Sequence, residues 1–153
     1  MSEDLATFLR ARLDEDEALA TVARDANTGV FASIGDADWH LVPGEGIWTD
    51  DHGIQVATGG IGLGDNEGAH IARHDPARVL REVEAKRNLV DSAAGAQHDR
   101  DYWRAQLPSD SVDLLKTVAA MEARWSAWHY VLTQLAASYV DHPDYQPELI
   151  VPW

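Results

Sequence analysis

Residues 70–94 read HIARHDPARVLREVEAKRNLVDSAA, and this stretch decides the fold because it combines a helix break, a helix start and an apolar helix face. Proline is favoured at the first position of a helix and aspartate directly before it, so Asp75-Pro76 ends one helix and starts another. The apolar residues of the second helix recur at helical spacing, at Val79, Leu80, Val83 and Val90. We therefore expect a broken helix over residues 66–94.

Two more helices are expected around it. The apolar spacing predicts a helix over residues 2–25 and a longer helix over residues 110–139, which Asp110 would cap and which would extend about 43 Å. The polar segment 95–101 is expected to separate this long helix from the broken one. The proline-containing tail, residues 140–153, is expected to be an irregular strap.

Residues 30–60 show a different pattern, with short β-rich runs separated by turn residues. This predicts a meander of three antiparallel strands at residues 38–42, 46–50 and 53–58, in which Trp39 and Trp48 pack across the ribbon. The whole chain, residues 1–153, then forms a single domain. Its fold class is mostly helical α+β, with helices packed on one another and the small sheet covering one end.

The chain carries 26 acidic and 12 basic residues and a formal net charge of −14. Such a charge repels nucleic-acid backbones and anionic membranes, so direct binding to either is not expected. Two interpretations of the charge remain open. It serves solubility alone, or it forms an acidic surface that occupies a basic site on another protein.

The sequence contains no cysteine, which excludes disulfides, thiolate metal sites and cysteine nucleophiles. Its N-terminus is acidic and amphipathic, unlike a signal peptide, and no apolar run approaches the ~18 residues of a membrane span. We therefore expect a cytoplasmic protein.

Three motifs resemble a known family. They are FLRARLDEDE at residues 8–17, HIARHDPARVLREVEAKR at residues 70–87 and YVDHPDY at residues 139–145. Together they resemble a family of small acidic proteins from actinobacteria and their phages that is catalogued as a domain of unknown function. The resemblance implies an intracellular protein, often encoded by phages or near mobile elements, and it implies no activity.

His70 and His74 lie four residues apart on a predicted helix, so both imidazoles project from one face at a spacing that can share a metal ion. With His142 and the carboxylate of Asp16 they would suit Zn²⁺ or Fe²⁺. The alternative is a polar packing network that needs no cofactor, in which Asp75 is a helix cap.

Arg12, Asp16 and Arg87 lie on or near apolar helix faces, where an unpaired charge is costly. We expect them to form a buried polar network with Asp75, or else a pocket for an anion. His129 lies within the apolar stripe of the long helix and is expected to be a core or interface histidine.

Two functions follow from these observations. The first is a protein–protein interaction module, an adaptor or inhibitor with a protein partner or a second copy of itself, anchored by tryptophans that include Trp125, Trp128 and Trp153. The second is a metal-binding protein or metal-dependent enzyme built on the histidines. No residue is assigned a catalytic role.

Overall fold

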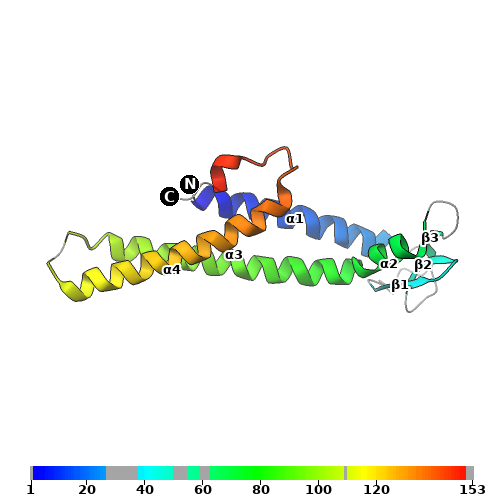
Figure 1. The fold of residues 1–153 in the computed structure, drawn as a ribbon, viewed down its shortest axis with the longest axis horizontal. Helices are drawn as coiled ribbons and strands as arrows, with labels where there is room; N and C mark the ends of the chain where they lie inside the picture. Colours follow the sequence, from blue (N-terminus) through cyan, green and yellow to red (C-terminus); the bar gives the residue numbers. More distant parts are fainter. Residues whose placement is uncertain (1, 27–37, 50–54, 59–62, 109, 151–153) are drawn as a thin grey trace. The chain divides into compact units, whose positions relative to one another are not determined.

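The computed structural model describes residues 2–26, 38–49, 55–58, 63–108 and 110–150. Its long helices are α1 (Ser2–Ala26), α3 (Pro76–Arg104) and α4 (Val112–Ala136), and α2 (Asp65–Arg73) is a short one. The strands are β1 (Trp39–Val42), β2 (Gly46–Thr49) and β3 (Gln55–Thr58), and two 3₁₀ helices follow α4, at Ala137–Tyr139 and Pro147–Ile150. The predicted fold class, mostly helical α+β with long N- and C-terminal helices, is confirmed (Figure 1).

The chain divides into two compact units. Unit 1 contains residues 1–13 and 85–153, and unit 2 contains residues 14–84. Both boundaries fall inside a helix, since α1 and α3 each contribute to both units. No helix in the described ranges is apolar over a length sufficient to span a bilayer.

In unit 1, the C-terminal part of α3 lies antiparallel to α4 (Figure 1). Two ion pairs join α3 to α4. Asp99 Oδ2 lies 2.9 Å from Arg124 Nη1, and Glu122 Oε1 lies 3.5 Å from Arg104 Nη1. The core consists of residues that recur at helical spacing on each helix: Leu5, Leu9 and Leu13 on α1, Val90, Ala93 and Ala96 on α3, and Val118, Trp125, Leu132 and Ala136 on α4.

The cap expected at the start of α3 is confirmed. The backbone N–H of Arg78 donates to Asp75 Oδ1 at 2.6 Å, and Pro76 occupies the first helical position. The expected end of this helix near residue 94 is wrong, because α3 continues to Arg104 through the polar segment. Packing explains the difference, since Ala96 is buried and the next turns pair with α4.

The start of α4 also differs from the expectation. Ser111 is the N-cap, because its side chain accepts a hydrogen bond from the N–H of Leu114 at 3.4 Å, and Asp110 lies outside the helix. The α-helix ends at Ala136 and tightens into a 3₁₀ turn that reaches Tyr139. With 29 residues, α3 is longer than α4, which has 25.

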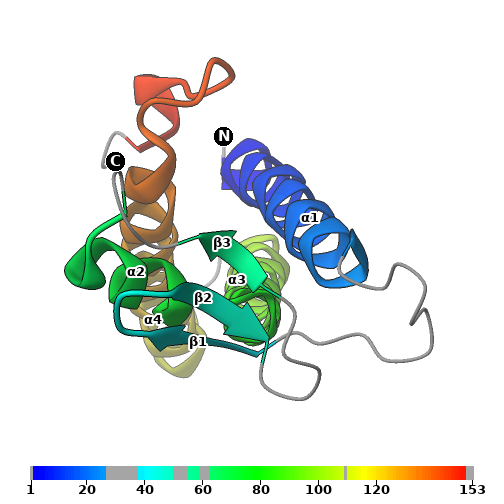
Figure 2. The same ribbon diagram turned by 90° about the vertical axis from the view of Figure 1, so that its right-hand side faces the viewer.

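In unit 2, the strands form an antiparallel sheet in the order β1-β2-β3 (Figure 2), which confirms the predicted meander. Gly44 has φ +78° and the Glu45 N–H donates to the Val42 carbonyl at 3.0 Å, so Pro43-Gly44 forms a type II turn between β1 and β2. The helix α2 contacts β1 and β2. Its Gly68 faces Leu41 so closely that an added Cβ would lie 2.7 Å from the leucine Cδ1.

The expected packing of Trp39 against Trp48 is wrong by one residue of register. Trp39 lies opposite Thr49, and Trp48 lies opposite His40. Side chains alternate between the two faces along a strand, so the two tryptophans lie on opposite faces of the sheet.

Candidate functional site

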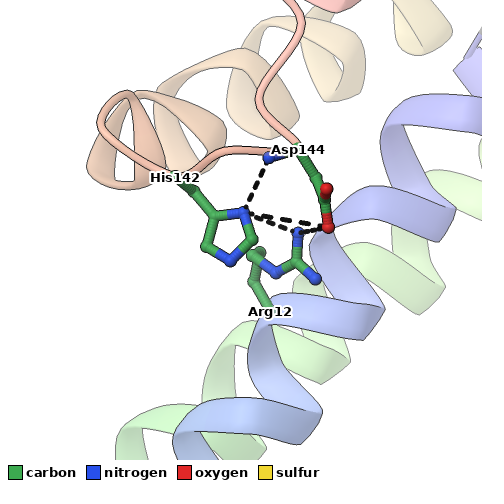
Figure 3. A network of polar contacts seen from close by, with 3 residues as sticks. All are labelled: Arg12, His142 and Asp144. Atoms are coloured by element: carbon green, nitrogen blue, oxygen red, sulfur yellow. Dashed lines mark hydrogen bonds and ion pairs between the residues drawn. The ribbon is translucent and has the colours of Figure 1, made fainter.

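The charged side chain that the structure buries most completely, among the residues that it describes, is Arg12 on α1. Only 5% of this residue is exposed, and one guanidinium nitrogen makes two contacts with the segment after α4 (Figure 3). Its Nη1 lies 2.9 Å from Nδ1 of His142 and 3.2 Å from Oδ2 of Asp144. We call Arg12, His142 and Asp144 the tail clamp, because they join the first helix to the C-terminal tail.

The local chain path explains how two tail residues reach one guanidinium. The His142 N–H donates to the Tyr139 carbonyl and the Tyr145 N–H donates to the His142 carbonyl, each at 2.9 Å, so the segment turns twice in succession. Pro143 is the second residue of the turn from His142 to Tyr145, where its ring fixes its φ. The backbone N–H of Asp144 also donates to Nδ1 of His142 at 3.1 Å, which holds the ring and the carboxylate on the same side (Figure 3).

Aromatic contacts surround the clamp. Phe8, one turn before Arg12 on α1, makes edge-on contacts with the rings of Tyr139, His142 and Tyr145 at centroid distances of 6.4, 6.3 and 6.1 Å. The guanidinium carbon of Arg12 lies 5.2 Å from the centroid of the Phe8 ring. The tail is therefore attached to α1 by an apolar ring cluster as well as by the polar contacts.

One ring nitrogen of His142 takes part in two polar contacts of the clamp. Its Nδ1 accepts from the backbone N–H of Asp144 and lies within hydrogen-bond distance of the Arg12 guanidinium. The Asp144 side chain is 69% exposed, and its Oδ2 lies 4.0 Å from Nδ1 of His142. The clamp thus holds a buried cation against an imidazole nitrogen and a carboxylate that water can reach.

The predicted histidine pair lies on the surface of unit 2. His70 and His74 are both exposed, with ring centroids 4.7 Å apart and ring planes inclined by 59°. His142 belongs to unit 1 and Asp16 to unit 2, where Asp16 is half-buried, so the three-histidine site stays a prediction. Across the described ranges, no three or more histidine, aspartate or glutamate side chains are grouped as a metal site would require.

The predicted polar network is distributed over both units. Arg12 and the half-buried Arg87 belong to unit 1, whereas Asp16 and Asp75 belong to unit 2. Asp75 caps α3 and Arg12 forms the tail clamp. A shared network of all four residues stays a prediction.

The predicted interaction tryptophans differ in exposure. Trp125 is only 4% exposed and lies under the guanidinium of Arg100, whose carbon is 4.9 Å from a ring centroid of the indole, so it is a core residue of unit 1 and unsuited to anchor a partner. Trp128 is half-buried, and Trp153 lies outside the described residues.

His129 is buried beside Trp125, with ring centroids 5.6 Å apart, in keeping with a core histidine. Burial lowers the pKa of His129 below its ordinary value, and the positive charge of Arg100 lowers it further.

Comparison with known proteins identifies the family of this chain. A model of a family of unknown function (DUF6221) matches residues 2–149. The chain belongs to this family. Searches of curated proteins and of solved structures found no match. The family therefore covers the tail clamp and both units and assigns no activity to them.

The sequence analysis did not single out Asp144, a member of the tail clamp, or Phe8, whose ring packs beside it. Asp144 follows His142 by two residues across a proline, and a His-Pro-Asp turn that places ring and carboxylate together is a local signal. Phe8 precedes Arg12 by one helical turn, the spacing at which an aromatic ring can cover a guanidinium.

Proposed function

We propose that the protein is an interaction module, an adaptor or inhibitor that binds a protein partner through an acidic and apolar helix surface. In support, the second half of α1 exposes an apolar face among carboxylates, which we call the outer α1 face: Glu15, Ala18, Leu19 and Val22. Leu19 is 71% exposed and Val22 is 65% exposed. Exposed apolar side chains grouped on one helix face are typical of binding surfaces.

The charge of the chain indicates the chemistry of the partner. Acidic residues outnumber basic ones by 26 to 12, and many of the basic ones are already paired with carboxylates of the same chain: Arg10, Arg12, Arg24, Arg78, Arg100, Arg104 and Arg124. The chain therefore carries an excess of negative charge. The matching partner has an apolar groove bordered by lysine or arginine.

The test is affinity capture from an actinobacterial lysate, with the full chain immobilised. A partner present in stoichiometric amount and released by salt is expected, because screening weakens an acidic-to-basic contact. The double variant Leu19→Ser, Val22→Ser should lose this partner. The control variant Val140→Ser changes another exposed valine, 57% accessible, that lies outside the outer α1 face, and it should retain the partner. A protein that captures nothing, or a partner that the double variant retains, would refute the proposal.

A second candidate function rests on the contact between His70 and His74. Two imidazoles with ring centroids 4.7 Å apart, one in the last turn of α2 and one on the residue directly after this helix, can chelate one divalent transition metal, leaving other coordination positions for water or for a further ligand. Isothermal titration with Zn²⁺ on untagged protein should show one site, which His70→Ala abolishes. The variant His98→Ala, at an exposed histidine of α3, is the control and should leave the site intact. Equal binding by both variants would exclude this candidate.

We further propose that the protein acts in the cytoplasm. The absence of cysteine from the sequence supports this location, since secreted proteins of this size often depend on disulfides.

A further inference from the structure

Positive side chains gather where α2 ends and α3 begins, on a chain that is otherwise strongly acidic. Residues 70–81 contain three arginines, two histidines and a single acidic residue, whereas the whole chain has 26 acidic and 12 basic residues. We call His70, Arg73, His74 and Arg78 the cationic elbow. All four belong to unit 2, and the first three are exposed. The local charge is therefore opposite in sign to the charge of the chain.

Two contacts bring these side chains to one place. The rings of His70 and His74 have centroids 4.7 Å apart, and Arg73 lies with His70 in the last turn of α2. Arg78 reaches back across the break between the helices, since its Nη1 donates to the carbonyl of Arg73 at 3.2 Å. Imidazole and guanidinium donors from two helices thus lie around the end of α2.

The end of α2 does not need all these side chains as caps. Cations are favoured at the C-terminus of a helix, because its last carbonyl groups lack donors within the helix. Here the backbone N–H of His74 donates to the Ile71 carbonyl at 3.0 Å. Arg78 serves the carbonyl of Arg73. Capping therefore accounts for Arg78 and leaves the other three side chains of the cationic elbow available to a ligand.

The carboxylates nearest in sequence do not neutralise these three side chains. Asp75 Oδ1 accepts from the backbone N–H of Arg78 at 2.6 Å, and Glu82 Oε1 accepts from Arg78 Nε at 2.7 Å. Glu67 folds over the start of α2, where its Oε2 lies 2.6 Å from the position that a Cβ on the residue before α2 would take. In the part of the chain that the structure describes, no carboxylate pairs with Arg73.

We propose that the cationic elbow binds the phosphate group of a small phosphate monoester. Such a group offers several acceptor oxygens, and a guanidinium donates two parallel hydrogen bonds to it. Arg73 supplies this fork, and each imidazole adds at least one N–H donor. Hydrogen bonds and charge hold the ligand, and no metal ion is required.

The charge of the chain restricts the ligand to a small one. At physiological ionic strength the Debye length is about 8 Å, so a phosphate group at the elbow responds mainly to the side chains around it and little to distant carboxylates. A nucleic acid or an acidic protein extends beyond this distance and meets the excess negative charge of the chain. A monoester, whose charge is confined to one group, avoids this repulsion.

The test is an NMR titration of the full chain with inorganic phosphate, in buffer freed of metal by a chelating resin and held at constant ionic strength with NaCl. The ring resonances of His70 and His74 should shift with an apparent Kd of about 1 mM, as expected for a few exposed charge-assisted contacts. The ring of His98, an exposed histidine of α3 in unit 1, should not shift. Glycerol phosphate and a nucleoside monophosphate, titrated in the same way, should bind at least as tightly, because each carries the same terminal group.

Two variants of equal charge test the role of Arg73. Arg73→Gln removes the guanidinium fork and should weaken phosphate binding at least about fivefold, the loss expected for one charge-assisted contact. Lys116→Gln is the matched control, since it removes one exposed cation from α4 in unit 1, and it should bind phosphate like the wild type. Circular dichroism confirms that each variant is folded.

Three results would overturn the inference. They are unshifted rings of His70 and His74 up to about 20 mM phosphate, an equal shift of the His98 ring, and equal weakening by Arg73→Gln and Lys116→Gln. The inference and the two candidate functions fail separately. Arg73→Gln should still capture the partner of the outer α1 face and still bind Zn²⁺ at the histidine pair, and the wild type should bind phosphate even where both of those candidates fail.

Discussion

Replacing Arg12 by alanine is the sharpest test of what holds the tail to the first helix. The change removes the guanidinium that donates to His142 and Asp144 and that lies over Phe8. It leaves Nδ1 of His142 with the Asp144 N–H as its remaining contact within the clamp. The contacts of the Phe8 ring with Tyr139, His142 and Tyr145 stay in place, so the variant tests what the guanidinium contributes apart from this ring cluster.

The expected cost follows from three contributions. A hydrogen bond from a buried charged donor contributes about 1.5–3 kcal/mol. The Asp144 side chain is 69% exposed, so its ion pair adds no more than about 0.5 kcal/mol. The cation over Phe8 adds about 0.5–1 kcal/mol. Arg12→Ala should therefore lower the free energy of unfolding by about 3 kcal/mol, equivalent to a decrease in Tm of about 9 °C for a chain of this length.

A matched control lies two residues away. Arg10 pairs with Asp91 at 2.9 Å, a similar distance, but both side chains are exposed, at 45% and 68%. Arg10→Ala should cost less than about 0.5 kcal/mol, because water screens the pair. Urea denaturation followed by circular dichroism measures both variants under identical conditions. Equal losses of stability in Arg12→Ala and Arg10→Ala would refute the reasoning that burial gives the clamp its strength.

Further predictions concern helix positions and pH. Gly95→Ala should raise the free energy of unfolding by about 0.5–1 kcal/mol, because this helical glycine has open space around it. Gly68→Ala should raise it less or lower it, because the new methyl group would meet Leu41. Denaturation curves of the two variants compare the two effects. Ser111→Ala should cost about 1 kcal/mol through loss of the α4 cap, and Ser111→Asp should restore most of it. Burial lowers the pKa of His129 in the folded chain, so the unfolded chain binds a proton at higher pH, and the free energy of unfolding should fall as the pH decreases below about 6.5. His129→Gln should flatten this dependence in melting curves measured from pH 7 to 5. An unchanged slope would exclude His129 as the source of the dependence.

Local sequence signals predicted most of the secondary structure. The Asp75-Pro76 start of α3 and the turn at Pro43-Gly44 were predictable because each depends on the backbone geometry of two or three neighbouring residues. The length of α3 was not predictable in the same way. Its last turns are stabilised by ion pairs with α4, a helix that comes later in the sequence. The polar residues in these turns, which would be typical of a loop, therefore continue the helix.

The candidate site shows the same limit. The unfavourable placement of Arg12 on an apolar face indicated that it needs a partner, but the partner lies 130 residues away. The spacing of His70 and His74 predicted that their rings lie near one another, and they do, although α2 ends at Arg73 and His74 is the residue that follows it. The burial of Trp125 was harder to predict from the sequence, because a helix with apolar residues on two sides does not reveal which side faces the core.

The separation of 130 residues between Arg12 and His142 has a consequence during synthesis. The first helix leaves the ribosome long before residues 142–144, so the guanidinium must stay hydrated until these residues have been made. A chain that stops before residue 142 carries a cation that its own fold buries and lacks the clamp residues that compensate for it. The tail clamp therefore couples native stability to the synthesis of residues 142–144, and chains truncated before these residues should be preferred substrates of cellular proteases.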